Sequence, residues 1–365
     1  MKKVANITLH AINNYGSVYQ SLATERLFED LGCSVETIDY VRENAQNDTV
    51  RKILTCKGAS PIIKLKMLAL HFMPKQSNRK EVLDAFRNKY LHLTPTKYRC
   101  DNDLLDKVPE ADIYCTGSDQ TWNTVCQGEI PLPFFLHFVP EGKKKIAFSA
   151  SFGISELPES DKAEVKRLLE SYHAISVREA TGLKILNDLE LKGTHVLDPT
   201  VAVGAKFWDQ LAAPRMFEEE YMLVYQLNQS SAFTKYMKDY AKEKGLKIVL
   251  IKARKDVELE NGVCLTDVTP EELLSLFKYS SKVLTDSFHA TVFSLMFHCD
   301  FMDIYPPKYS TRLDSILNMV GLQERHVVDF NRYDYCDTPI NYDRVDSIIE
   351  RERHNTIEFL KDAIS

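Results

Sequence analysis

Signals for strands and helices alternate along this chain, and that alternation limits the folds open to it more than any other feature. Residues 4–9 read as a strand, residues 18–31 carry leucines at helical spacing, and residues 35–40 form a second apolar run. Gly32 closes the helical segment as a suitable C-cap, because glycine adopts the left-handed conformation without strain. Alternating elements of this kind are typical of α/β layering around parallel sheets. The sequence therefore predicts an α/β fold.

The alternation continues toward the C-terminus, and the length calls for more than one core. Further strands are expected at 112–116, 145–150, 174–177, 194–197, 221–226, 248–251 and 283–284, and further helices at 233–244 and 270–279. A chain of 365 residues usually divides into two domains. Pro214 and the acidic run 218–220 interrupt the pattern. We expect two Rossmann-like domains facing a cleft, at residues 1–205 and 206–335, followed by an amphipathic helix at 340–365.

Cysteines and apolar runs indicate the setting of the protein. The eight cysteines are scattered, without a CxxC pair or a Cys/His cluster at zinc spacing, so we expect reduced thiols, a cytoplasmic protein and no metal site. The apolar N-terminal run contains Asn6 and His10 and lacks a cleavage site, which favours a strand over a signal peptide. No run approaches ~20 apolar residues, so no membrane-spanning helix is expected.

Charge is distributed unevenly. Residues 51–99 hold twelve Lys and Arg against two acids, a local excess of +10 in a chain whose remainder is −16. We expect a basic helical insertion at about residues 50–100 of the first domain. One interpretation is a solvated helical face beside one core helix. The other is peripheral contact with an anionic membrane or with a lipid-linked, phosphorylated substrate. Nucleic acid is disfavoured, because aromatic residues do not alternate with the basic ones as stacking platforms do.

The stretch 283–297 combines a strand end, a polar turn and an apolar helix (VLTDSFHATVFSLMF). Asp286 or Ser287 suits the N-cap position, which places His289 in the first helical turn. Free backbone N–H groups and the helix dipole favour anions at such a helix start. A titratable imidazole beside an anion site suits the transfer of an anionic group. The alternative is an ordinary capped core helix with a satisfied histidine.

Other polar motifs also follow predicted strands. They are 14–16 (NYG), 117–123 (GSDQTWN), 149–153 (SASFG), 176–179 (SVRE) and 196–200 (VLDPT). A further motif, TRLDSIL, occupies 311–317. Ligands of open α/β sheets bind beyond the carboxyl ends of the strands, so these motifs are expected to gather in the cleft.

Together these motifs resemble the polysaccharide pyruvyltransferase family, in the family's order and from residue 4 to about residue 325. The resemblance implies a fold like that of two-domain (GT-B-like) glycosyltransferases. It implies transfer of the enolpyruvyl carbons of phosphoenolpyruvate to two hydroxyls of a hexose as a cyclic ketal. Phosphoenolpyruvate would then be a co-substrate, and no cofactor or metal would be needed.

The resemblance also implies roles for individual residues. His289 matches the family histidine of the phosphoenolpyruvate site and is expected to transfer protons, with Asp119 as the second catalytic candidate. Arg178 and Arg312 match arginines that hold the donor, and Ser287 is expected to bind its phosphate. Some members carry Arg-Leu-His where this chain has Ser287, Phe288 and His289, and Arg312 is expected to supply the missing charge. The acceptor candidates are Asn14, Gly16, Ser118, Asp119, Trp122 and Asn123.

Structural explanations stand beside these roles. Arg178 and Glu179 could form an interdomain ion pair, Asp119 could cap a helix, and Trp122 could pack in a core. Asn14 and Gly16 could only shape the first strand-to-helix loop.

The leading hypothesis is a bacterial pyruvyltransferase acting on a surface-polysaccharide or lipid-linked oligosaccharide precursor. It would work in the cytoplasm, peripherally at the inner face of the membrane. The alternative enzyme is a nucleotide-sugar-dependent glycosyltransferase of the same architecture. A ligand-binding or assembly protein with a degenerate site is the third hypothesis.

Overall fold

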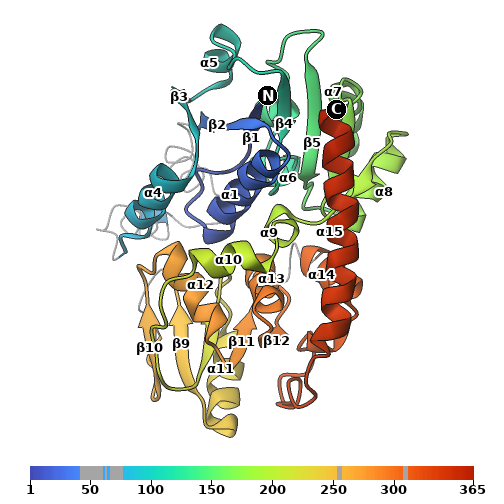
Figure 1. Ribbon diagram of the computed structural model, residues 1–365. Coiled ribbons are helices and arrows are strands. Elements are labelled where there is room, and N and C mark those ends of the chain that lie inside the picture. Colours follow the sequence, from blue (N-terminus) through green and yellow to red (C-terminus); the bar gives the residue numbers. More distant parts are fainter. Residues whose placement is uncertain (42–60, 62–63, 66–76, 253–256, 307–310) are drawn as a thin grey trace.

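Two parallel β-sheets, one above the other in Figure 1, form the framework of the protein. The computed structural model describes residues 1–41, 61, 64–65, 77–252, 257–306 and 311–365. Sheet A has the strand order β3-β2-β1-β4-β5-β6-β7, and sheet B has the order β10-β9-β8-β11-β12. Every strand pair in both sheets is parallel, and most of the connections contain helices, as expected for crossover topology. The predicted α/β class is confirmed.

Sheet A is built from the N-terminal half of the chain. Its strands are β1 (Lys3–Ile7), β2 (Ser34–Tyr40), β3 (Leu93–Tyr98), β4 (Ile113–Thr116), β5 (Lys144–Ala150), β6 (Ala174–Val177) and β7 (Thr194–His195). The helical segments are α1 (Tyr15–Asp30), α4 (Arg79–Tyr90), α5 (Asp101–Asp106), α6 (Thr124–Gln127), η1 (Leu132–Phe135), α7 (Glu159–Leu169), α8 (Ala180–Asp188) and α9 (Pro199–Ala202).

Sheet B is built from the C-terminal half. Its strands are β8 (Tyr221–Tyr225), β9 (Lys247–Ile251), β10 (Gly262–Leu265), β11 (Lys282–Thr285) and β12 (Asp300–Asp303). Its helical segments are α10 (Ala205–Leu211), α11 (Ser231–Lys244), α12 (Pro270–Lys278), α13 (Phe288–Met296), α14 (Thr311–Val320), η2 (Gln323–Arg325) and α15 (Tyr342–Ile364). The limits predicted for the two domains stay a prediction.

Aromatic side chains join the two halves. The Tyr19 ring of α1 lies 4.8 Å from Phe293 of α13 and 5.4 Å from Trp208 of α10, all in edge-to-face contact. Such pairs add to the stabilisation from area burial. The Tyr19 hydroxyl also donates to the carbonyl of Pro270, at the start of α12. One apolar cluster therefore runs through both halves and fixes how the carboxyl ends of the two sheets face each other.

Helix α15, red in Figure 1, runs past sheet B and returns to sheet A. Its Thr356 hydroxyl accepts a hydrogen bond from the Leu197 amide, and Arg353 donates to the carbonyl of Ala202. Lys2 donates to the carbonyl of Ile364, which brings the two chain ends together. The last helix thus contacts both halves of the chain.

Strands β3, β10 and β12 were not among the predicted elements. β3 carries Pro95 and Lys97 at the edge of sheet A, where a missing N–H and a charged side chain are tolerated. A basic helical insertion was expected at about residues 50–100; the described part of this range contains the helix α4 and also the strand β3. Within the predicted insertion the structure describes residues 61, 64–65 and 77–100. The other residues of the insertion lie outside the described part of the chain.

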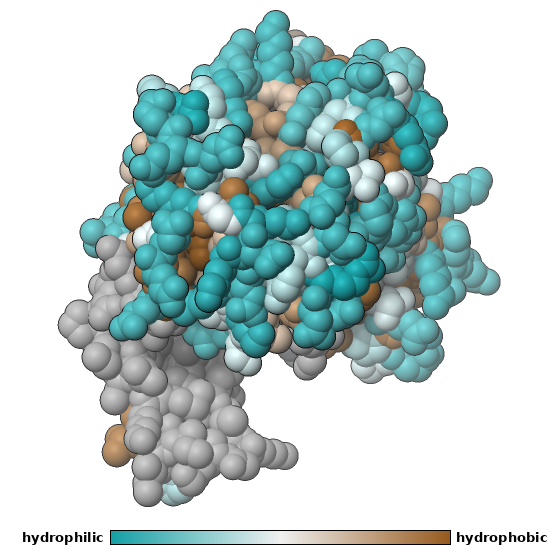
Figure 2. Space-filling model, turned by 90° about the horizontal axis from the view of Figure 1, so that it is seen from below, coloured by the Kyte–Doolittle hydropathy of each residue, from teal (hydrophilic) through white to brown (hydrophobic). Residues whose placement is uncertain are grey.

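The lower end of the molecule is hydrophilic. In Figure 2, which looks at the molecule of Figure 1 from below, hydrophilic residues cover most of the described surface and hydrophobic ones are scattered. Among the helices of the described ranges, none combines the length and apolar character that crossing a membrane requires.

Candidate active site

The two residues before α13, Asp286 and Ser287, leave the first backbone N–H groups of the helix without a side-chain cap. Asp286 accepts hydrogen bonds from the amides of Leu227 (2.7 Å) and Asn228 (2.8 Å), so its carboxylate fixes the loop after β8. Ser287 occupies the N-cap position, but its side chain makes no capping hydrogen bond. The first backbone N–H groups of α13 have no intrahelical partner. The predicted anion-favouring helix start is therefore present, with Ser287 rather than Asp286 as the N-cap residue.

His289 lies in the first turn of α13 and faces α1 across the domain interface. Its side chain is enclosed, since the residue is 8% exposed. A Cβ atom at Gly16 would lie 2.1 Å from Nδ1 of His289, so only glycine allows this close approach. Nε2 of His289 is buried and meets no hydrogen-bond partner in the described chain. Burial lowers the pKa of His289 to about 4; Arg178 and Arg312 act in the same direction and Asp198 and Asp119 oppose it.

Three carboxylates surround Arg178, which follows β6. Nη1 donates to Oδ2 of Asp198 at 2.7 Å, and Nη2 donates to Oδ1 of Asp119 at 3.3 Å. Nε lies 3.7 Å from Oε2 of Glu179. The Arg178 guanidinium also lies over the Phe288 ring, 5.1 Å from its centroid. This cation is therefore enclosed by groups of the protein itself.

The Arg178 charge controls the neighbouring carboxylates. Burial alone would raise the pKa of Asp198, but the Arg178 and His289 charges and hydrogen bonds from Thr200 and Arg178 hold the pKa at about 2. Asp119 behaves in the same way, and its pKa is lowered by Arg178, His289 and Arg312 against the effect of burial. The carboxylates in turn raise the pKa of Arg178 against its own burial. Both acids are thus anionic at neutral pH.

Asp119 reaches the site on a left-handed turn after β4. Its φ of 77° is uncommon outside glycine, though Asp is among the residues that tolerate it best. The carboxylate accepts from the Ser17 hydroxyl (3.0 Å) and from the Gln120 amide (2.8 Å). Its side chain stays 14% exposed, whereas those of Arg178 and Asp198 are fully buried.

Arg312, in the first turn of α14, differs from Arg178 in that no acidic residue of the described ranges forms an ion pair with it. Its Nε, like Nε of Arg178, is buried without a hydrogen-bond partner in the described structure. Burial lowers the pKa of Arg312, and the nearby Arg178 charge lowers it further, while Asp119, Glu179 and Asp198 oppose the shift. The Arg312 guanidinium is thus close to the cluster and available to an external anion.

A cavity of about 510 Å³ opens between α8, α14 and α15, and none of the predicted site residues lines it. Thr181 and Thr311 line it from the starts of α8 and α14. The hydroxyls of both threonines are buried and lack hydrogen-bond partners in the described structure. Polar groups without partners beside a cavity are suited to binding a polar ligand.

A sequence model of the polysaccharide pyruvyl transferase family matches residues 14–302, which include Gly16, Asp119, Arg178 and His289. The chain belongs to this family. No curated protein matches the sequence at a significant level.

The fold of this pyruvyl transferase family member is similar to that of solved sugar-nucleotide epimerases. A putative UDP-N-acetylglucosamine 2-epimerase from Listeria monocytogenes covers 96% of this chain and 90% of its own, with 9% identity and a TM-score of 0.53. The UDP-GlcNAc 2-epimerase from Neisseria meningitidis, bound to UDP-GlcNAc, covers 100% and 99%, with 9% identity and a TM-score of 0.52. At such identities the likeness concerns the fold alone, which is GT-B-like as predicted.

The structure contradicts three of the acceptor assignments made from the GSDQTWN motif. Trp122 is 0% exposed; its ring stacks on Phe135 at 5.4 Å, and its indole N–H donates to the carbonyl of Phe134. Asn123 is buried and caps α6, accepting from the Cys126 amide. Ser118 is buried and donates to Asp198. These side chains build the wall behind Asp119 and present no surface to a sugar.

The remaining acceptor candidates lie at the start of α1. Asn14 is the N-cap residue, and its side chain accepts from the Gly16 amide. Gly16 contacts the His289 ring, so both residues adjoin the site while shaping the loop. Whether they contact an acceptor stays a prediction.

Asp198 is the central residue that the sequence did not reveal as functional. Asp198 is the N-cap residue of α9, and its side chain accepts from the Thr200 amide. Its ion pair with Arg178, twenty residues earlier, depends on how β6 and β7 pair. No local pattern could have shown that contact.

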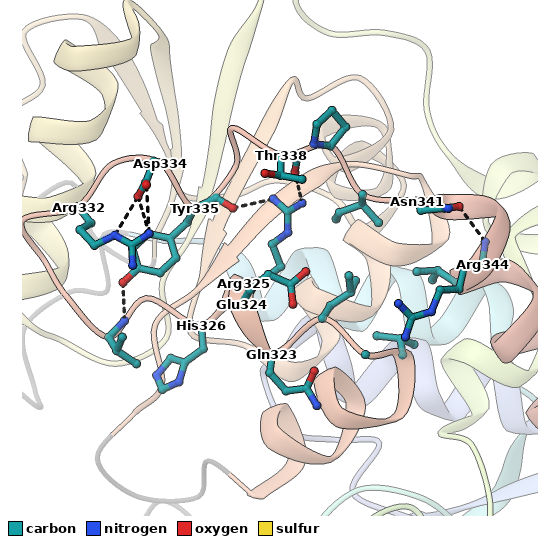
Figure 3. Close-up of a pocket in the computed structure, with 17 residues that line it drawn as sticks. Gln323, Glu324, Arg325, His326, Arg332, Asp334, Tyr335, Thr338, Asn341 and Arg344 are labelled. Atoms are coloured by element: carbon teal, nitrogen blue, oxygen red, sulfur yellow. Dashed lines mark hydrogen bonds and ion pairs between the residues drawn. The ribbon is translucent and has the colours of Figure 1, made fainter.

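A second cavity, of about 570 Å³, lies at the other end of α14 (Figure 3). Two of its three arginines are occupied: Arg325 donates to the carbonyls of Tyr335 and Thr338, and Arg332 pairs with Asp334. These contacts hold the loop before α15. None of the predicted site residues lines this cavity.

The basic segment 51–99 is partly neutralised where the structure describes it. Lys80 and Arg87 pair with Asp84, Lys89 pairs with Glu271, and Lys97 lies 3.9 Å from Asp39.

In the described ranges no group of three or more His, Cys, Asp or Glu residues is arranged to hold a metal ion.

Proposed function

We propose that the protein transfers the pyruvyl carbons of phosphoenolpyruvate to two hydroxyls of a hexose, forming a cyclic ketal. Two buried nitrogens without hydrogen-bond partners in the described structure carry this proposal: Nε2 of His289 in the first turn of α13 and Nε of Arg312 in the first turn of α14. The Arg312 charge acts on His289, so the two groups serve one site. A proton acceptor and a free cation beside a helix N-terminus are what an anionic enol donor and a hydroxyl nucleophile require.

The donor binds on the C-terminal side of the site. Arg312 forms charge-assisted hydrogen bonds to its carboxylate or phosphate, and the Ser287 hydroxyl and the first amides of α13 hold phosphate oxygens. Arg178 acts mainly by fixing Asp119 and Asp198, because its guanidinium already lies among three carboxylates.

The reaction follows from the protonation states. With a pKa of about 4 the His289 imidazole is neutral in the empty site. The bound anionic donor and the nearby carboxylates raise the imidazole pKa, so that His289 can take up a proton and deliver it to the terminal carbon of the donor, creating a methyl group. The central carbon is then electrophilic; an acceptor hydroxyl bonds to it and gives its proton back to the neutral imidazole. The second hydroxyl then closes the ring, inorganic phosphate leaves, and the second hydroxyl proton ends on the phosphate.

The acceptor is a precursor of a bacterial surface polysaccharide, carried on a lipid at the cytoplasmic face of the membrane. The local excess of +10 in residues 51–99 supports a contact with anionic lipid or its phosphates. The family match supports a polysaccharide precursor as acceptor.

A second candidate is transfer from a nucleotide sugar. It is favoured by the fold, since the Neisseria meningitidis epimerase binds UDP-GlcNAc on a similar framework. Under this alternative, His289 and Arg312 would serve a nucleotide diphosphate.

Thermal unfolding with each donor separates the two candidates, because a ligand that binds only the native state raises its stability. We expect phosphoenolpyruvate to raise Tm in a concentration-dependent way, and UDP-sugars to have a smaller effect at equal concentration. Incubation with a hexoside and phosphoenolpyruvate should release inorganic phosphate and give a product with a ketal methyl signal by NMR. A Tm response to UDP-sugars alone would replace the first candidate by the second.

A further inference from the structure

Arg79 is one of the twelve basic residues of segment 51–99, yet it is placed between the two halves of the molecule. It opens α4, where its amide donates to the Ser77 hydroxyl (3.2 Å). The same hydroxyl donates to Oδ1 of Asp267 (2.7 Å), in the loop after β10. The start of α4 is therefore fastened to the C-terminal half, and Arg79 cannot move freely on the surface.

The Arg79 guanidinium has a free edge. It lies over the Tyr15 ring, 5.3 Å from the centroid, and its Nε and Nη2 are buried. Neither of these two nitrogens has a hydrogen-bond partner in the described structure, and no carboxylate of the described ranges forms an ion pair with Arg79. Burial raises the pKa of Tyr15 to about 12, and the charge of Arg79 and a hydrogen bond with its side chain oppose that shift, so the guanidinium has a polar neighbour but no anion. Nε and Nη2 form one edge of the planar group, which matches two oxygens of a phosphate or carboxylate. Buried N–H groups of a cation that lack an acceptor are stabilised when an anion binds them.

Tyr225 adds a third donor. It ends β8, is 4% exposed and packs edge-to-face with Tyr15 at 6.2 Å. Its hydroxyl is buried and unpartnered in the described structure, and the Arg79 charge acts on it. The Tyr15 hydroxyl, by contrast, donates to the carbonyl of Val268.

This pair of free groups adjoins the active site. Tyr225 is the register partner of Thr285, which lies two residues before Ser287. Tyr15 precedes Gly16, the residue in contact with His289. Neighbouring strands lie about 4.8 Å apart, so Tyr225 is one strand away from the start of α13.

We propose that Arg79 and Tyr225 form a phosphate subsite beside His289, and that this subsite holds a phosphate group attached to the acceptor sugar. Two N–H groups and one O–H group match three oxygens of a tetrahedral phosphate better than the two of a carboxylate. The assignment to the acceptor rests on the proposed function, in which Arg312 serves the donor. The existence of the subsite does not.

Titration of the full-length protein with inorganic phosphate tests the subsite directly. An Arg312→Gln background removes the proposed donor cation. In that background, Arg79→Gln should weaken phosphate binding about tenfold or more, the loss expected for a charge-assisted pair. Tyr225→Phe, which keeps the ring and removes only the hydroxyl, should weaken it roughly threefold to tenfold. Lys80→Gln is the matched control, since it removes the next charge on α4, which is half-exposed and paired with Asp84. It should leave the affinity unchanged.

Equal phosphate affinities in the Arg79→Gln, Tyr225→Phe and Lys80→Gln proteins would overturn the subsite. If Arg79→Gln fails to fold, Tyr225→Phe decides alone. The phosphate titration does not depend on phosphoenolpyruvate. If the protein does not bind phosphoenolpyruvate, but Arg79→Gln and Tyr225→Phe both weaken phosphate binding, the proposed function is refuted and the subsite is supported.

The acceptor assignment has its own test. Binding of a hexose 1-phosphate, or of a hexose on a short-chain prenyl diphosphate, should weaken in Arg79→Gln. The ligand whose affinity falls more identifies the source of the phosphate, either a sugar phosphate or a lipid-linked diphosphate. Binding of an uncharged methyl hexoside should not. Equal dependence of the methyl hexoside and the phosphorylated sugars on Arg79 would refute the assignment.

Discussion

The Arg178 charge lowers the pKa of Arg312, and both charges act on His289, but the two arginines differ in their ion pairs. Arg178, on the side of sheet A, is enclosed by Asp119, Glu179 and Asp198. Arg312, on the side of sheet B, forms no ion pair with an acid of the described chain, and its buried Nε has no hydrogen-bond partner there. Nε2 of His289 also has no hydrogen-bond partner in the described chain.

The contrast separates two tasks that one cation could not perform together. A cation whose charge is already compensated gains little from a ligand and instead positions its neighbours. An uncompensated cation is costly in the empty protein and is stabilised by an arriving anion. The N-terminal wall of the site, formed by Arg178 and its carboxylates, is therefore built to be rigid. The C-terminal wall, which carries Arg312, is built to bind an anion.

The largest expected effect concerns His289, on which both arginine charges act. His289→Gln should lower kcat by about 100- to 10,000-fold, because a positioned acid or base contributes in that range. Steady-state kinetics with phosphate release measures the change. His298→Gln is the matched control, since that imidazole lies just beyond the other end of α13, half-exposed and paired with Asp346. Near-native turnover of His289→Gln would show that His289 takes no part in the chemical step.

Substituting the two arginines alike tests the comparison itself. Arg178→Gln should lower the free energy of unfolding by about 3–5 kcal/mol, because it leaves buried carboxylates without their cation. Arg312→Gln should leave stability unchanged or higher, and weaken phosphoenolpyruvate binding about tenfold or more. Urea unfolding and donor titration measure both effects. If both variants lose the same stability and the same donor affinity, the division into a rigid and a binding wall fails.

The smallest expected effect is a pH dependence of stability from His289. Its folded pKa of about 4 lies below the ordinary value of 6.5, so between these values the unfolded chain binds more protons and stability falls as the pH falls. The slope is at most about 1.4 kcal/mol per pH unit. Asp303 acts in the opposite direction, since burial raises its pKa to about 8. The difference between wild type and His289→Gln, measured by urea unfolding from pH 4.5 to 7, isolates the histidine; parallel curves would show an imidazole that titrates in the fold as it does in the unfolded chain.

The sequence predicted the parts of this site that depend on local order. Asp119, Arg178 and His289 each follow a strand, and the carboxyl ends of parallel strands converge, so their meeting could be expected. His289 also lies in the first turn of α13, as predicted.

Other features depend on contacts between distant segments. Residue type could not tell whether Trp122 faces a sugar or Phe135, because the stacking depends on how η1 folds over it. Nor could it separate Arg178 from Arg312, since their difference lies in the carboxylates around each and not in the arginine itself.

The order in which the chain is synthesised gives α15 a particular place in assembly. This helix packs against α9 and contacts Lys2, the residue before β1, yet it is made after every strand of either sheet. Domains tend to fold from the N-terminus as the chain emerges from the ribosome. The half that begins to fold first thus waits for a helix that is made after both sheets, and a ribosome that stalls after β12 would release both sheets without the contacts that α15 makes to α9 and Lys2.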